Sequence, residues 1–106
     1  MDRELYQHRA RIIKALAHPT RLAIADALAE GEVCVCKLQG IAGSDMSTIS
    51  KHLAVMKAAG ILADRKEGLR VFYRLQVPCI LNFLGCVDAV IQHNAATQSR
   101  LAALVR

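Results

Sequence analysis

The stretch that most constrains the fold is DMSTISKHLAVMKAAGIL, residues 45–62. Ile49, Leu53 and Met56 lie at positions i, i+4 and i+7, a spacing that places apolar side chains on one face of an α-helix. A Ser or Asp just before this stretch is a favoured helix N-cap, so Ser44 or Asp45 is expected to begin the helix. The residues left facing outward are small and hydroxylated or basic. They are Ser47, Thr48, Ser50 and Lys51.

A shorter helix is expected just before it, over residues 35–42, with Gly43 making the turn between the two. Two helices joined by a Gly-containing turn form a helix-turn-helix, whose second helix enters the ~12 Å wide major groove of DNA. The alternative is an ordinary amphipathic helix with a solvated outer face. If the helix binds DNA, the side chains expected to contact base edges are Ser47, Thr48, Ser50, Lys51 and His52.

The segment ADRKEGLRVFYRL, residues 63–75, predicts a β-hairpin that turns around Glu67 and Gly68. Val71, Tyr73 and Leu75 alternate with more polar positions along its second strand. A basic hairpin after a helix-turn-helix is typical of a winged helix, in which the hairpin, or wing, lies along the DNA backbone or minor groove. The residues expected to contact the backbone are Arg65, Lys66 and Arg70. A solvated hairpin with no partner is the alternative.

Three further helices are expected. The first has apolar residues at helical spacing from Leu5 to Ala17, and the second begins near Pro19. The buried stripe of the second is predicted at Leu22, Ala25, Leu28 and Ala29. The last opens at Pro78 and is apolar over more than half its circumference, so it needs partners on several sides.

The fold class that follows is mainly α with a β-hairpin, in the order α-α-α-α-β-β-α. Residues 1–106 form one winged helix-turn-helix domain, in which residues 95–106 continue the last helix or fray. The apolar terminal helices are expected to form a homodimer, whose two-fold symmetry suits an inverted-repeat operator.

The composition indicates which class of partner and which cellular compartment to expect. The formal charge of +5 suits a polyanion, and the shortage of aromatic residues favours duplex over single-stranded nucleic acid. No run of ~20 apolar residues and no secretion signal is present, so a cytoplasmic location is expected, where cysteines stay reduced. Paired carboxylates, a Gly-rich phosphate loop, a Ser/His/Asp set and a C-x-x-C are not apparent, so no enzyme is expected.

Three stretches together resemble the ArsR/SmtB family of metal- and metalloid-responsive bacterial repressors. They are ALAHPTRLAIADAL, EVCVCKL and STISKHLAVMKAAGILADRKEGLRVFYRL. The resemblance implies a dimeric transcriptional repressor that loses DNA affinity when an inducer binds. Cys34 and Cys36 match the C-V-C of the arsenic- and cadmium-type members, which implies As(III) or Sb(III) as inducer, or else Cd(II), Pb(II) or Zn(II). The arsenic-type pattern has a third cysteine where this chain has Gln39.

Cys34 and Cys36 can bind one ion only if the chain is extended or unwound between them, because residues i and i+2 of a helix face about 200° apart. A helix N-terminus there, with Lys37 adjacent, is expected to lower both thiol pKa values. An ion that draws both sulfurs to one side would then distort the start of that helix.

Cys79 or Cys86, from either subunit, could supply a third ligand, or both could simply fill the dimer interface. A redox or persulfide switch at Cys34 and Cys36 is the alternative to ion binding. Zinc at the last helix is disfavoured, because only Asp88 and His93 are available there.

Overall fold

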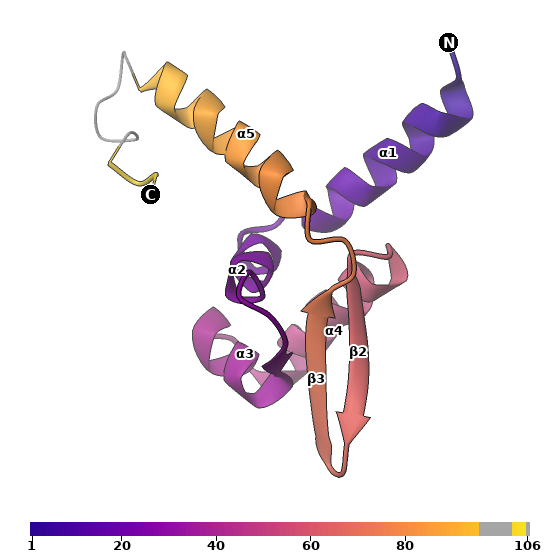
Figure 1. Ribbon diagram of the computed structural model, residues 1–106, viewed down its shortest axis with the longest axis vertical. Coiled ribbons are helices and arrows are strands. Elements are labelled where there is room, and N and C mark those ends of the chain that lie inside the picture. The colour runs from indigo at the N-terminus through magenta and orange to yellow at the C-terminus, as the bar shows by residue number, and fades with distance from the viewer. Residues whose placement is uncertain (96–102, 106) are drawn as a thin grey trace.

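A computed structural model describes residues 1–95 and 103–105 (Figure 1). The elements are α1 (Arg3–Leu16), α2 (Pro19–Ala27), β1 (Val33–Cys34), α3 (Val35–Ala42), α4 (Met46–Ala58), β2 (Leu62–Glu67), β3 (Arg70–Leu75) and α5 (Ile80–Asn94). The winged helix-turn-helix expected from the sequence is therefore confirmed. None of the described helices is long and apolar enough to cross a bilayer.

A single apolar cluster holds α2, α3, α4 and the sheet together. The predicted stripe of α4 is at its centre, since Ile49, Leu53 and Met56 are each 1% exposed or less. The other large side chains of the core are Leu16, Ile24, Leu28, Leu38, Ile61, Leu62 and Leu75. On α2 the prediction was partly wrong. Leu22 is exposed and Ile24 is buried, because α2 packs mainly on α3 and α4 rather than on α1. Ala29 is also exposed and lies beyond the end of α2.

The wing is a tight antiparallel hairpin. Glu67 pairs with Arg70, so Gly68 and Leu69 form the two-residue loop between β2 and β3. Gly68 adopts a φ of 62°, in the left-handed region that glycine enters at no steric cost. The hairpin extends beyond the helices as the lower tip of the molecule in Figure 1.

Two features differ from the sequence-based expectation. A third strand, β1, pairs with β3 at the edge opposite β2, so the sheet order is β1-β3-β2. Two residues have no periodicity, so their strand character comes from pairing with β3 alone. In addition, α5 begins at Ile80 rather than at Pro78, because residues 77–79 form a turn closed by hydrogen bonds from Ile80 N to Val77 O and from Leu81 N to Pro78 O.

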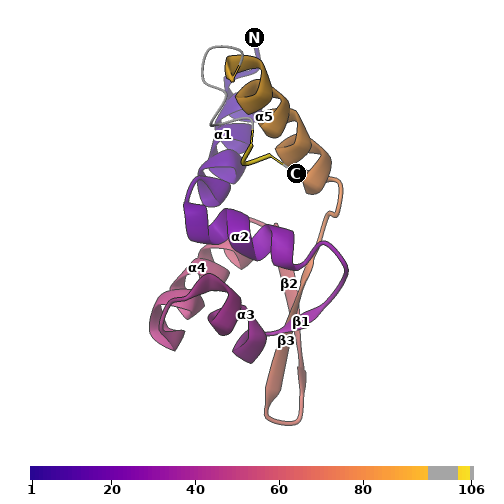
Figure 2. The same ribbon diagram turned by 90° about the vertical axis from the view of Figure 1, so that its left-hand side faces the viewer.

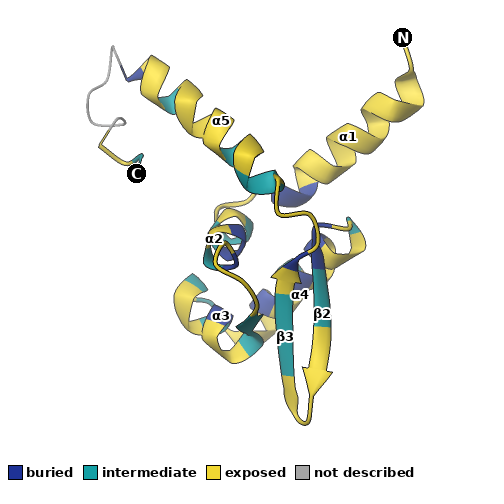
Figure 3. Cartoon of the chain, in the orientation of Figure 1, coloured by how far each residue is buried: buried dark blue, intermediate teal, exposed yellow. Residues whose placement is uncertain are grey.

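The terminal helices project from the core. α1 and α5 diverge upward from the body in Figure 1, and Figure 2 shows both at the end opposite the wing. Both are mostly exposed in Figure 3, and no residue between Ile80 and Asn94 is buried. Of the predicted tail, Ala95 is the C-cap of α5, residues 103 and 104 form a turn, and the rest apart from residue 105 lies outside the described residues.

Candidate nucleic-acid interface and thiol site

Helix α4 presents the predicted polar face to solvent. Ser47, Thr48, Ser50 and Lys51 are all exposed, on the side opposite the buried stripe. Asp45 fixes the start of the helix, since its carboxylate accepts hydrogen bonds from the Thr48 amide at 2.8 Å and the Ser47 hydroxyl at 3.4 Å. These hydrogen bonds lower the pKa of Asp45, so the cap is a carboxylate at neutral pH. A helix start with short, exposed side chains and Lys51 in its second turn fits a major groove.

His52 lies at the edge of this face and is half-buried, so its predicted base contact stays a prediction. Its Nδ1 accepts a hydrogen bond from Arg21 Nε at 3.0 Å, and its ring lies 4.4 Å from the His18 ring. Burial, and then the neighbouring His18 and Arg21, lower the pKa of His52, so it stays neutral and can accept from Arg21. The histidine therefore joins α4 to α2. The sequence alone could not show this, because the side chain lies at the boundary between the buried and exposed faces.

The wing cations differ in what they contact. Lys66 and Arg70 are exposed near the tip of the hairpin. Arg65 instead forms a bidentate ion pair with Glu32, both carboxylate oxygens lying 2.9 Å from its Nε, and a second pair with Glu67 at 2.8 Å. These partners raise the pKa of Arg65 further above its ordinary value. The predicted contact of Arg65 with the DNA backbone stays a prediction, and the structure adds that its guanidinium is paired with two carboxylates.

Cys34 and Cys36 lie side by side where the sheet meets α3. Cys34 ends β1 and is the N-cap of α3, with an extended backbone (φ −65°, ψ 142°), and Cys36 lies in the first turn of the helix. The extended residue turns both side chains to one side, and their sulfurs are 2.6 Å apart. The condition set by the sequence, an extended chain between the two cysteines, is therefore met without unwinding α3.

The two thiols have different acidities. Hydrogen bonding from Cys36, together with the Cys36 and Lys37 amides and the charge of Arg70, lowers the pKa of Cys34. The same contact with Cys34, with burial, raises the pKa of Cys36. The prediction that the helix N-terminus lowers both values is therefore wrong for Cys36, because a thiolate beside it disfavours a second negative charge.

The remaining cysteines lie elsewhere. Cys79 directly precedes α5 and Cys86 lies within it, and both are exposed. Helix α5 leads away from β1 in Figures 1 and 2. Within residues 1–95 and 103–105, no three His, Cys, Asp or Glu side chains gather as an ion site, so one protomer brings together only two of its four predicted ligands.

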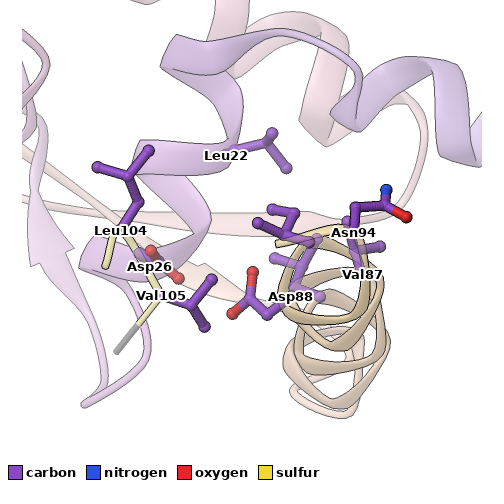
Figure 4. Close-up of a pocket in the computed structure, with 9 residues that line it drawn as sticks. Leu22, Asp26, Val87, Asp88, Asn94, Leu104 and Val105 are labelled. Carbon is purple, nitrogen blue, oxygen red and sulfur yellow. The ribbon is translucent and has the colours of Figure 1, made fainter. Parts of the chain in front are cut away.

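A groove between α2 and α5 has a different lining from the thiol site (Figure 4). Its volume is about 330 Å³, and its walls are mainly apolar, with Leu22, Leu84 and Ile91 among them. The acidic groups Asp26 and Asp88 line it, and no thiol does. It is therefore unsuited to a thiophilic ion.

Known proteins are similar to this chain over the helices and strands described above. The family model for the bacterial regulatory protein, arsR family, matches residues 18–64. An uncharacterized HTH-type transcriptional regulator of Methanocaldococcus jannaschii is 42% identical over 86 residues, which cover 80% of this chain and 97% of that protein. The arsenical resistance operon repressor of Escherichia coli is 46% identical over 66 residues, 61% of this chain and 56% of the repressor. The chain thus matches little more than half of that second relative.

A solved structure agrees over nearly the whole chain. It is the homodimeric winged helix-turn-helix DNA-binding domain of a possible ArsR-family transcriptional regulator from Mycobacterium bovis. The two share 33% sequence identity with a TM-score of 0.77, and the match covers 91% of this chain and 92% of that one. The similarity therefore includes the wing and the terminal helices as well as residues 18–64.

Proposed function

Because this chain belongs to the ArsR family of bacterial regulatory proteins, we propose that it is a repressor released from its operator when a thiophilic ion binds Cys34 and Cys36. The coarser part of this statement follows from the family: the chain is a DNA-binding transcriptional regulator of the repressor type and not an enzyme. The proposal adds the inducer, the residues that bind it and the assembly.

The observation that supports the inducer site is the pair of adjacent, accessible sulfurs. Thiolates are preferred ligands of soft ions, and Cys34 is the more readily ionised of the two. We place arsenite or antimonite first, since the E. coli relative is an arsenical resistance repressor, and Cd(II), Pb(II) or Zn(II) after them. A third protein ligand would have to come from outside the described part of the protomer, and Cys79 or Cys86 of a second copy is the candidate.

The assembly we propose is a homodimer through α1 and α5, acting in the cytoplasm on an inverted-repeat operator. Leu5, Ile13, Phe83, Val87 and Val90 are all at least 40% exposed on these helices, which is costly for large apolar side chains in water. A second copy would cover them. Two α4 helices would then contact successive major grooves through Ser47, Thr48, Ser50 and Lys51.

Operator release is the direct test. A duplex selected from a random pool is labelled, and fluorescence anisotropy follows its release as arsenite, antimonite, cadmium or zinc is added under reducing conditions. We expect an inverted repeat to be selected, and the inducing ion to weaken its binding by roughly 5- to 150-fold, the usual range of allosteric coupling. If no thiophilic ion changes the affinity, the proposed inducer is wrong.

A second prediction concerns the contribution of the wing to DNA affinity. Lys66→Ala should weaken binding to all DNA sequences alike and lower the salt dependence, by about one unit of slope for each phosphate that is no longer neutralised. Lys14→Ala, on α1 and away from the wing, removes the same charge and should leave the slope nearly unchanged. Salt titrations of both variants measure this. A change of base preference at one operator position would instead assign Lys66 to base recognition.

The 2.6 Å separation of the sulfurs also favours a second candidate, a redox switch. The Cys34 thiolate would attack a hydroperoxide oxygen and form a sulfenic acid with release of an alcohol or water. Cys36 would then displace hydroxide, so that two thiols and one hydroperoxide give a disulfide, an alcohol and water. Intact mass separates the two mechanisms, because a disulfide loses two hydrogens and a bound ion adds its own mass.

A further inference from the structure

One face of the sheet connects the thiol site to the wing. Directly paired residues of neighbouring strands point to the same side of a sheet. Cys34 pairs with Phe72, and Phe72 pairs with Arg65, so these three side chains form one row across β1, β3 and β2. The guanidinium of Arg65 lies over the Phe72 ring, 4.7 Å from its centroid.

The Arg65 guanidinium also forms an ion pair with Glu32, which lies two residues before Cys34. Arg65 Nε lies 2.9 Å from each oxygen of the Glu32 carboxylate. β1 and β2 are not neighbours in the sheet, and this ion pair therefore joins the residue before β1 directly to β2, without passing through β3.

β2 is also connected to the recognition helix on its other face. Asp64, the residue next to Arg65, pairs with Lys57 in the last turn of α4 at 3.0 Å. β2 thus forms one ion pair with the segment that carries the two thiols, residues 32–36 (the thiol segment), and another with α4. A displacement of the thiol segment can reach both DNA-contacting elements through β2.

Binding an ion would move this segment. Two thiolates on one ion are held at the separation that the ion's own bonds set, roughly 3.8 Å in the case of a tetrahedral ion with bonds of about 2.3 Å. The ion would therefore fix Cys34 to Cys36, and with it β1 to the first turn of α3, in place of the free contact between the two thiols. Cys36 is held within α3, whereas Cys34 belongs to a two-residue edge strand, which is the part more easily moved.

We propose that the Glu32–Arg65 ion pair transmits occupation of Cys34 and Cys36 to the wing and α4, making Glu32 a positioning residue for the inducer response. This inference rests on the proposed function, since it needs an ion at the thiols. Without the pair, Cys34 and the residues before it move while β2 stays in its DNA-binding position.

Glu32→Gln is the informative variant, because Glu32 is not among the residues proposed to contact DNA and its effect on the charge of Arg65 is matched by Glu67→Gln. We expect operator affinity without inducer to stay within about twofold of the wild type. The ratio of operator affinities without and with inducer should fall about three- to tenfold, within the usual range of allosteric coupling. Thiolate-to-metal absorption on titration with cadmium should show that the ion still binds.

Glu67→Gln is the matched control, since it removes the other carboxylate partner of Arg65 but lies on the same strand as Arg65. It should leave the response unchanged. The reversed pair, Glu32→Arg with Arg65→Glu, should restore part of the response that Glu32→Gln removes. A wild-type response in Glu32→Gln, with the ion bound, would overturn the inference. Absence of any response in the wild type would instead overturn the proposed function.

Discussion

Cys34→Ser is expected to abolish release of the operator by arsenite, leaving a change in affinity below about twofold where the wild type changes by roughly 5- to 150-fold. The hydroxyl of serine does not ionise near neutral pH and is a poor ligand for soft ions. Only two sulfurs meet at this site within the described part of the protomer, so loss of either leaves a single thiol. Anisotropy titrations of Cys34→Ser and Cys36→Ser beside the wild type measure the effect.

The structure supplies an internal control for folding. Cys34 occupies the N-cap of α3 without a side-chain capping hydrogen bond, and serine is among the best capping residues. Cys34→Ser should therefore match or exceed the wild type in thermal stability, by up to about 1 kcal/mol. Cys79→Ser and Cys86→Ser make the same chemical change outside the pair. A full arsenite response in Cys34→Ser would exclude the site, whereas its loss in Cys79→Ser or Cys86→Ser would identify a third ligand.

Val90→Glu is expected to convert a dimer into monomers and to weaken operator binding by about 100-fold or more, because two linked half-sites bind far more tightly than one. Val90 is 57% exposed and lies with Phe83 and Val87 on the uncovered apolar face of α5. A carboxylate there would be buried without a partner in the proposed dimer, at a large cost in free energy. Light scattering gives the mass, and anisotropy the affinity.

Gln92→Glu is the matched control, since it adds the same charge to the same helix at an exposed polar position. It should leave both mass and affinity near the wild-type values. The circular dichroism spectrum of Val90→Glu should also be unchanged, because exposed positions contribute little to protomer stability. A dimeric Val90→Glu that binds its operator normally would show that α5 does not form the interface.

Much of the fold was predictable because its signals are local. The stripe of Ile49, Leu53 and Met56 identified α4, and Gly43 and Asp45 marked its start. The turn of the wing was recognisable from Glu67 and Gly68 between two extended runs, the second of which alternates. Each of these signals is fixed by helix or strand geometry within a few residues.

The candidate site was predictable only in part. Cys34 and Cys36 were recognisable as a pair, but their geometry depends on β1, whose two residues become a strand by pairing with β3. The role of Glu32 had no local signal, because its partner Arg65 is 33 residues away. His52 was assigned to the DNA side, since nothing in the sequence places it beside Arg21, 31 residues earlier.

The sequence by itself determined the order of helices, the hairpin, the polar outer face of α4 and the presence of two nearby thiols, all of which follow from spacing along the chain. The tertiary structure alone decided which cations are exposed, which thiol is the more acidic and how the thiol segment joins the wing. These properties depend on distances between charges on separate elements, and such distances exist only after the core has brought β1, β2 and α4 together.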